Sequence, residues 1–484
     1  MNVLLVVFDT LRYDYIAANG SEWVRTPNLD RFAAEATVFD NSYTASYPTI
    51  PHRTDVITGR YGSPFHPWLP LRFDAVALPQ VLASAGYATQ LICDTPHLIN
   101  GGHNFDFPFH AWHFIRGNEV DRHWLDDRSA ELPPEQHARY RRPDGKFFPT
   151  AMQYIRNNRH RVREDEWPSP RLFADVCRWL EDNRRRENFF LWVDCFDPHE
   201  PWDPPTHYIE LYAPDYREVG DLGILYGWES IGSKDLTSER IARMRVHYAG
   251  EVTMADAAFG RMLDKLEATG LARNTIVIVT SDHGTNLGAH GHIHKDYPLW
   301  DQVAHSVLMV RVPGQPGGIR RKEMIQPQDI FPTLCELVGA EVPETVEGHS
   351  FAKLLGNDEE QPWPRQVVLS SAAIDLRKDR PSVITIQDAE WCLLDAPDPS
   401  RRRLYHKPTD PEEEDECLAD FPDVAKELHE KLLEELKARG AHPALVDWFA
   451  TGEKGDVPAD YRLRDPYLDA YVPYFSRILP EDRE

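Results

Sequence analysis

The run Val3-Leu4-Leu5-Val6-Val7-Phe8 is apolar throughout and ends at a single acid, Asp9. Comparable apolar runs that end in polar residues occur at Ala88–Cys93, Phe189–Cys195, Thr275–Thr280 and Ser306–Val312. Continuous apolar runs without alternation are typical of strands covered on both faces, as in a largely parallel sheet. Helical patterns lie between them, for example at Glu251–Thr269, which ends at Gly270. Strands that alternate with helices predict a doubly wound α/β sheet.

Acidic residues and histidines, which can act as catalytic groups or metal ligands, follow these predicted strands directly. Along the chain, they are Asp9 after the first strand, Asp94 and His97 after the second, Asp197 and His199 after the third, and Asp282 and His283 after the fourth. Ligands of doubly wound sheets bind beyond the carboxyl ends of the strands. We therefore expect these side chains to gather at one site.

The composition limits the class of protein. The chain has 484 residues and a formal net charge of −25. Because a protein that holds phosphate backbones needs a basic surface, we expect no nucleic-acid partner. The first apolar run is shorter than a signal-peptide core, and no stretch approaches the ~20 apolar residues of a membrane span. The six cysteines lack CxxC spacing and fit reduced thiols, so we predict a cytoplasmic protein without membrane contact.

The apolar pattern changes along the chain, which predicts separate parts. Residues 1–364 are expected to form a catalytic domain, with an insertion at about 116–167 that is rich in Arg, His and aromatic residues. A C-terminal subdomain is expected at 365–440, with strands at Val367–Ser371, Ser382–Gln387 and Glu390–Leu394 and a helix at Val424–Arg439. The Pro- and Tyr-rich segment 441–484 is expected to be an extended tail that could mediate homo-oligomerisation.

The segment Thr49-Ile50-Pro51-His52-Arg53 places a hydroxyl at the start of a predicted helix. A nucleophile gains there from the N–H groups of the first turn, and Arg53, one turn later, can hold both the nucleophile and an anion. The alternative interpretation is a capped surface helix with a chance arginine.

Two further motifs supply metal and substrate groups. Ser281-Asp282-His283-Gly284 offers a carboxylate and an imidazole to one cation, a common ligand mixture, and Lys295 follows. Asp197-Pro198-His199-Glu200 follows another predicted strand. Taken singly, Asp282 could cap a helix with His283 as a bystander, and His199 could be an ordinary loop histidine.

Together with Asp9-Thr10, these motifs closely resemble the sulfatase family of the alkaline phosphatase superfamily, over roughly Met1 to Gly440. The resemblance implies an alkaline-phosphatase-like, mostly parallel doubly wound sheet with a smaller C-terminal domain of antiparallel strands and a helix. It also implies one divalent cation held by Asp9, Thr49, Asp282 and His283. A set with an imidazole suits Mn²⁺ or Zn²⁺ better than Ca²⁺.

Several positions depart from a typical sulfatase. Thr49 stands where the family has a Cys or Ser that is oxidised to formylglycine, and a threonine cannot be oxidised in this way. Thr10 replaces a second acid after Asp9, and His283 stands where sulfatases have Asn. The family's Lys-Trp-His segment is represented by Asp94-Thr95-Pro96-His97, so a substrate-binding lysine is lost.

The threonine decides the predicted substrate class. A threonyl sulfate lacks the exit that the hydrated aldehyde provides, whereas water can displace threonine from phosphorus. We therefore predict a metal-dependent hydrolase of phosphodiesters or phosphonate monoesters, which acts on a small anionic ester through a covalent Thr49 intermediate. The alternatives are a sulfatase-type sulfuric ester hydrolase, a phosphoryl transferase and a non-catalytic anion-binding homologue.

Each candidate residue has an expected role. The catalytic candidates are Thr49, Arg53, His199 and Lys295, and the substrate-binding candidates are His97, Thr10 and Asp94. His290, His292 and His294 are weaker candidates for substrate contact. Because no motif assigns any of the 21 histidines to a further cation, we predict a single metal ion.

Overall fold

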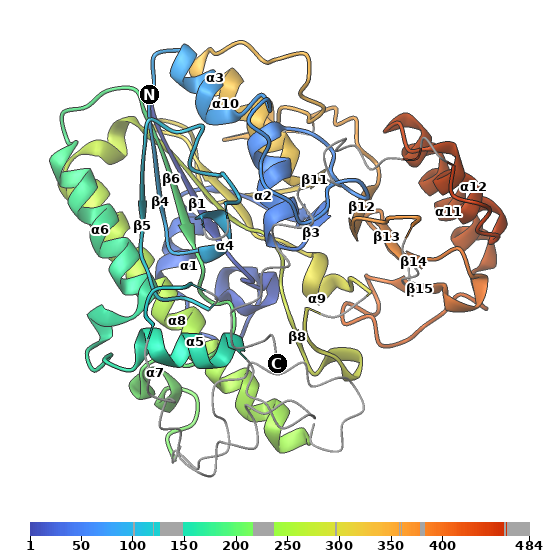
Figure 1. Ribbon diagram of the computed structural model, residues 1–484, viewed down its shortest axis with the longest axis horizontal. Helices are drawn as coiled ribbons and strands as arrows, with labels where there is room; N and C mark the ends of the chain where they lie inside the picture. The colour runs from blue at the N-terminus through green and yellow to red at the C-terminus, as the bar shows by residue number, and fades with distance from the viewer. Residues whose placement is uncertain are drawn as a thin grey trace.

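The structure is a computed structural model (Figure 1). It describes residues 1–99, 102–119, 121–125, 149–215, 237–295, 298–357, 359, 361–377, 383–458 and 461. The apolar runs of the sequence form its centre, and the helices between them lie on either side (Figure 1).

An eight-stranded sheet forms the larger domain. Its order is β11 (Ile319–Ile325), β2 (Thr37–Ser42), β10 (Leu308–Arg311), β7 (Thr275–Ser281), β1 (Asn2–Phe8), β6 (Phe189–Cys195), β4 (Ala88–Cys93) and β5 (Ala111–Phe114). The segment from β7 to β5 is parallel throughout, and β10 runs antiparallel to both of its neighbours. The predicted doubly wound, mostly parallel sheet is therefore confirmed, and the predicted apolar runs are strands within it.

Alternate side chains of β1 enter two separate cores, which is why its whole sequence is apolar. One core packs against α1 (Pro27–Ala34), α6 (Pro168–Asp182) and α8 (Ser238–Ala268). The other packs against α2 (Thr49–Thr58), α3 (Leu78–Ser84) and α10 (Ile330–Val338) on the opposite face. The first core takes Leu4, Val6 and Phe8, and the second takes Val3, Leu5 and Val7.

A smaller sheet forms the C-terminal domain. Its order is β15 (Arg403–His406), β14 (Trp391–Asp395), β13 (Ile384–Gln387), β12 (Val368–Ala372) and β3 (Ser46–Tyr47). The helices α11 (Pro422–Ala438) and α12 (Pro443–Thr451) bury their apolar faces against it. The predicted antiparallel strands and the long helix are confirmed.

The segment after Gly440 differs from the expected extended tail. Leu445, Val446 and Phe449 of α12 are buried in the core of the C-terminal domain, because apolar residues at this spacing share one helix face. Residues 443–451 thus belong to that domain. An oligomerisation arm after α12 stays a prediction, and residues 462–484 lie outside the described residues.

The strand β3 joins the two domains next to the predicted nucleophile. Ser46 pairs with Ser371 and Tyr47 with Ala372, both in parallel register, so this N-terminal segment is an edge of the C-terminal sheet. Thr49 begins α2 directly after this strand. The C-terminal domain therefore helps to position the start of α2.

The remaining short elements lie mostly around the carboxyl edge of the large sheet. They are α4 (Pro96–Ile99), α5 (Pro149–Asn158), α7 (Thr206–Glu210), α9 (Asp301–Ala304), β8 (Asn286–Leu287) and β9 (Ile293–His294). In the expected insertion at 116–167, α5 and its neighbouring segments are described, whereas residues 120 and 126–148 lie outside the described residues.

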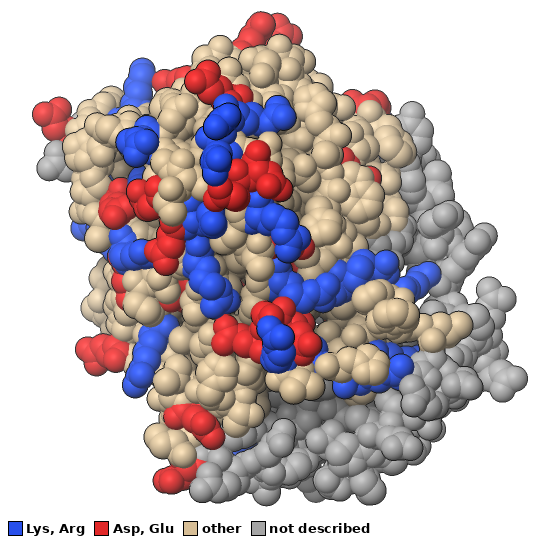
Figure 2. Space-filling model, turned by 90° about the vertical axis from the view of Figure 1, so that its left-hand side faces the viewer, with Lys and Arg blue, Asp and Glu red and all other residues tan. Residues whose placement is uncertain are grey.

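The surface on the α6 side carries basic and acidic side chains in alternation (Figure 2). None of the helices in the described part of the chain has the length and apolar character needed to cross a bilayer. All six cysteines are free thiols, and most of them are buried, as expected for core residues.

The buried Glu413, at the contact between the C-terminal domain and α9, makes the stability of the protein depend on pH. Its carboxylate is fully buried and accepts a hydrogen bond of 2.9 Å from the backbone N–H of Asp301 in α9. Burial, reinforced by the Asp301 carboxylate, raises the pKa of Glu413 from 4.5 to about 8. The folded state therefore binds a proton that the unfolded state releases, and this contribution to stability, complete below pH 4.5, is lost as the pH rises toward 8.

We expect Glu413→Gln to flatten this dependence, because glutamine stays neutral at every pH. Thermal unfolding at about pH 5 and about pH 8 should show a smaller loss of Tm in the variant than in the wild type. The neighbouring Glu414 is exposed, so Glu414→Gln serves as the control. Equal pH dependence of Tm in the wild type and Glu413→Gln would contradict the raised pKa of Glu413.

Candidate active site

Asp9, Asp282 and His283 form a buried cluster at the carboxyl edge of the large sheet. Asp9 follows β1 and Asp282 follows β7, and these strands are parallel neighbours in which Phe8 is paired with Ser281. Equivalent ends of neighbouring parallel strands bring the next residues side by side. All three side chains are fully buried, and their ligand atoms lie within 4.8 Å of one another.

His283 is held as a neutral imidazole with one free nitrogen. Its Nδ1–H donates to the carbonyl of Gly284 at 2.7 Å, and its buried Nε2 has no hydrogen-bond partner among the described residues. Burial is the main reason that the pKa of His283 is lowered to about 3. The Asp9 carboxylate raises this pKa, whereas the charges of Lys295 and Arg53 lower it further. A buried imidazole nitrogen without a partner is the group that a metal ion would satisfy.

Thr10 orients both carboxylates of the cluster. Its hydroxyl donates to Asp9 Oδ1 at 2.7 Å, and its backbone N–H donates to Asp282 Oδ1 at 2.8 Å. Thr10 adopts a left-handed φ of 64°, and the hydroxyl of Tyr248 donates to its carbonyl at 2.7 Å. The predicted substrate-binding role of Thr10 stays a prediction, because this hydroxyl contacts a carboxylate.

The helix α2 brings Thr49 and Arg53 to the same edge. Thr49 is its first residue, and Arg53 follows one turn later on the same helix face. The Arg53 guanidinium is fully buried and forms ion pairs with Asp9 at 3.4 Å, with Asp194 at 3.0 Å and with Asp282. Burial alone would lower the pKa of Arg53, but the three carboxylates raise it, so the guanidinium stays charged.

Asp194 is a member of the site that no sequence motif marked. It lies inside β6 beside Val7 of β1, and it also accepts hydrogen bonds from the Thr95 hydroxyl at 2.6 Å and the Trp192 indole at 3.0 Å. A single acid within the apolar run Phe189–Cys195 was the available signal. A charge in a strand covered on both faces requires a buried partner, and here the partner is Arg53.

The charges of this cluster fit a divalent cation. Three carboxylates face one guanidinium and one neutral imidazole, which leaves a formal excess of negative charge in a buried position. Unbalanced charge in a protein interior is costly. The donor set of Asp9, Asp282 and His283 therefore suits the divalent ion that the sequence predicts. Tyr47, two residues before Thr49, contacts the His283 ring with centroids 4.8 Å apart.

Lys295 and His199 lie beside this cluster and share one carboxylate. Lys295 Nζ contacts both Glu200 oxygens, at 3.0 and 2.9 Å, and His199 Nδ1 lies 3.5 Å from the same carboxylate. Burial alone would raise the pKa of Glu200, but His199 and Lys295 lower it well below its ordinary value. Glu200 therefore stays ionised and neutralises the positive charge of Lys295.

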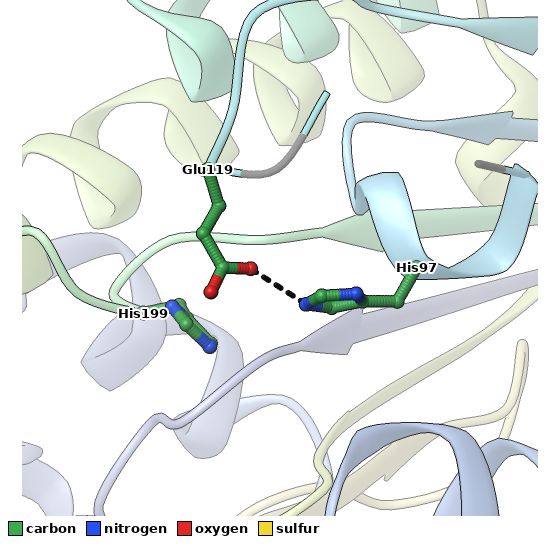
Figure 3. A group of neighbouring side chains, drawn as sticks. All are labelled: His97, Glu119 and His199. Atoms are coloured by element: carbon green, nitrogen blue, oxygen red, sulfur yellow. Dashed lines mark ion pairs between the residues drawn. The ribbon is translucent and has the colours of Figure 1, made fainter. Parts of the chain in front are cut away.

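His97 pairs with Glu119, which sequence reasoning did not single out. His97 Nε2 lies 2.6 Å from Glu119 Oε2, and the same carboxylate approaches His199 (Figure 3). Burial alone would raise the pKa of Glu119, but His97 and His199 lower it. Glu119 follows β5, at the border of the aromatic and basic insertion, and no motif marks it.

Asp94, which was predicted to contact substrate, supports the backbone of the segment after β6. It is fully buried, and its Oδ1 accepts a hydrogen bond from the backbone N–H of Phe196 at 2.7 Å. Burial and the neighbouring Asp197 raise the pKa of Asp94 well above its ordinary value. In this structure Asp94 supports the loop that carries His199, and direct substrate contact stays a prediction.

The weaker histidine candidates contact tryptophan rings, and two of them, His290 and His294, are stacked on these rings. Ring centroids are 4.2 Å apart for His290 and Trp300, 4.8 Å for His292 and Trp300, and 5.3 Å for His294 and Trp202. These contacts give the three imidazoles a packing role.

A doubly wound sheet with acidic and imidazole ligands at its carboxyl edge, a hydroxyl at a helix start and a buried arginine defines an alkaline-phosphatase-like ester hydrolase. The sulfatase family model matches residues 1–340, and the model for the C-terminal region of N-sulphoglucosamine sulphohydrolase matches residues 288–439. The chain therefore belongs to the sulfatase family of the alkaline phosphatase superfamily.

Individual relatives are distant. An arylsulfatase of Clostridium perfringens is 27% identical over 385 residues, covering 73% of this chain and 78% of that protein. Human iduronate 2-sulfatase is 25% identical over 407 residues, covering 72% and 71%. The crystal structure of a phosphonate monoester hydrolase of Agrobacterium radiobacter is similar in fold, with a TM-score of 0.71, 22% identity and coverage of 90% and 96%.

Proposed function

We propose that this chain hydrolyses sulfuric acid esters with the help of a divalent cation. The observation that carries the proposal is the buried, negatively charged cluster of Asp9, Asp282 and neutral His283 at the carboxyl edge of the sheet. Membership of the sulfatase family and the similarity to an arylsulfatase and an iduronate 2-sulfatase support the sulfate ester as substrate class.

The residues around the bound ester have separate roles in metal binding, positioning and proton transfer. Asp9, Asp282, His283 and the Thr49 hydroxyl would hold the cation, which when bound supplies Lewis-acid stabilisation of negative charge. Arg53 keeps the carboxylates together through its ion pairs. Lys295 contacts the ester oxygens and provides a proton for the departing alcohol. Overall, the sulfur–oxygen bond to the alcohol breaks, water supplies the new oxygen, and the products are an alcohol and hydrogen sulfate.

The charges around the site favour an ester with a single negative charge. The Glu200 carboxylate is paired with Lys295, and the Glu119 carboxylate lies against His97, so two carboxylates lie in this part of the site. A dianionic phosphate monoester would meet these carboxylates with one more charge than a sulfate ester carries. This arrangement supports sulfate esters, phosphodiesters and phosphonate monoesters over phosphate monoesters.

Hydrolysis of phosphonate monoesters or phosphodiesters is the second candidate function, and Thr49 is the observation that favours it. The sequence analysis placed this function first, whereas the family and the relatives support the sulfate ester better. In this reaction, Thr49 Oγ1 bonds to phosphorus as the leaving alcohol departs with a proton. Water then breaks the phosphorus–threonine bond and restores the hydroxyl.

Parallel assays of para-nitrophenyl esters test these proposals. We expect the wild type with Mn²⁺ or Zn²⁺ to hydrolyse para-nitrophenyl sulfate with a higher kcat/KM than bis(para-nitrophenyl) phosphate, para-nitrophenyl phenylphosphonate or para-nitrophenyl phosphate. Chelation of the metal should remove the activity. Asp9→Asn, prepared in the same way, controls for contaminating enzymes, because it removes a predicted ligand.

The outcomes separate the candidates. A clear preference for a phosphorus ester would select the second function and overturn the first. Equal rates for wild type and Asp9→Asn would show that the measured activity does not come from this site. Transfer of the phosphoryl group to an added alcohol, measured as a mixed ester, would identify the transferase alternative.

A further inference from the structure

We propose that His97, Glu119 and His199 form a second divalent-cation site beside the cluster of Asp9, Asp282 and His283. This site goes beyond the proposed function, which requires only the first cluster. It also departs from the sequence-based expectation of a single metal ion.

The three residues come from adjacent strands of the sheet. His97 lies in α4 directly after β4, His199 follows β6, and Glu119 lies in the segment after β5. These strands are parallel neighbours, in which Cys93 of β4 pairs with Asp194 on one side and with Phe114 on the other. The first cluster is built in the same way from β1 and β7, so the two groups continue along one carboxyl edge.

The side chains converge as ligands of one ion would. Figure 3 shows the imidazoles of His97 and His199 on either side of the Glu119 carboxylate. One ligand atom from each residue lies within 4.8 Å of the other two. The exposed fractions of the side chains are 14% for His97, 16% for Glu119 and 5% for His199, so the group is shielded from solvent.

Outer contacts fix the orientation of both rings. His199 Nδ1–H donates to the carbonyl of Glu200 at 2.6 Å, which leaves Nε2 with a free lone pair. The His199 ring stacks on Phe196 with centroids 3.9 Å apart, and the edge of His97 contacts Trp68 at 4.9 Å. A histidine that ligates a metal commonly donates its other N–H to a carbonyl in this manner.

A simple ion pair explains only part of this arrangement. Glu119 Oε2 lies 2.6 Å from His97 Nε2, yet it is buried and receives no well-aligned hydrogen bond from the described residues. An ion pair of His97 and Glu119 also gives no reason for the second imidazole at the same carboxylate. Glu119 also has a left-handed φ of 31°, a backbone conformation that residues with a side chain rarely adopt.

The donor set indicates the kind of ion. Two imidazoles and one carboxylate, with a position left for water or an oxyanion, form the ligand pattern of many zinc sites. Ca²⁺ and Mg²⁺ prefer oxygen ligands and fit poorly. We therefore use Zn²⁺ as the probe.

Equilibrium dialysis of the metal-free full-length chain against Zn²⁺, followed by elemental analysis, tests the proposal without an activity assay. We expect two tightly bound ions per wild-type chain, one in Glu119→Gln and one in Asp282→Asn. The loss of affinity in Glu119→Gln should exceed the about 10–100-fold typical of an outer-shell change. Asp175→Asn is the matched control, because Asp175 pairs with the exposed His113 at 2.9 Å outside the site, and it should keep two ions.

Each outcome supports or contradicts the second metal site. Wild type and Glu119→Gln binding equal numbers of ions would overturn the second site. A single ion that is lost in Glu119→Gln but kept in Asp282→Asn would support this site and contradict the first cluster, on which the proposed function rests. If Glu119→Gln fails to fold by circular dichroism, His97→Asn replaces it in the same comparison.

Discussion

Thr49→Ala is expected to lower kcat/KM for a phosphodiester or phosphonate monoester by on the order of 10⁶-fold, the scale seen when a nucleophile is removed. Thr49 begins α2 one turn before Arg53, which contacts both Asp9 and Asp282. We therefore expect its hydroxyl to attack phosphorus in these esters and to join the carboxylates as a metal ligand. Thr49→Ser keeps the hydroxyl and should retain activity within about tenfold of the wild type.

The Thr49 experiment needs measurements that separate chemistry from folding. Thr49 is buried, so alanine removes one methyl group and the hydroxyl. We expect an unchanged circular dichroism spectrum and a fall in Tm of only a few degrees. Thr49→Val, which keeps the volume without the hydroxyl, should be as inactive as alanine. Activity of Thr49→Ala or Thr49→Val within tenfold of the wild type would remove this hydroxyl from the mechanism.

Arg53→Met is expected to destabilise the metal-free protein by about 3–5 kcal/mol, the usual cost of breaking a buried ion pair. The reason is that Asp9, Asp194 and Asp282 would then share a buried position without a cation. A bound divalent ion restores positive charge next to Asp9 and Asp282. We therefore expect saturating Zn²⁺ or Mn²⁺ to recover part of the lost stability.

The metal dependence distinguishes this arginine from other buried arginines. Arg365 is also buried and pairs with Asp329, at a position away from the proposed ligands. Arg365→Met should lower the free energy of unfolding to a similar extent with or without metal. Denaturation in chelator and in added metal measures both variants, and an Arg53→Met loss that is identical in the two conditions would contradict the charge balance proposed here.

Local sequence patterns were sufficient for the framework of the site. The apolar runs that end at Asp9 and Ser281 identify two buried strands, and neighbouring parallel strands place Asp9 beside Asp282 and His283. Likewise, Thr49 and Arg53 share a helix face because they are four residues apart. These relations depend on strand and helix periodicity, which the sequence carries directly.

Ion pairs between residues far apart in the chain could not be predicted from such patterns. Asp194 was hidden within an apolar strand, although it lies 3.0 Å from Arg53, a residue 141 positions away in the chain. Glu119 and Glu200 belong to loop segments whose side chains meet His97 and Lys295 only after the sheet is assembled. The segment after Gly440 was expected to be an extended tail because it is rich in Pro and Tyr. That composition does not show that one face of α12 packs into the core of the C-terminal domain.

The sequence by itself determined the fold class, which candidate functional residues follow the central strands, and the first group of candidate metal ligands. Only the tertiary structure decided which charges face one another: Arg53 with three carboxylates, Lys295 with Glu200, and the two imidazoles with Glu119. Periodicity is a property of neighbouring residues, whereas charge pairing depends on distances between segments that only packing brings together.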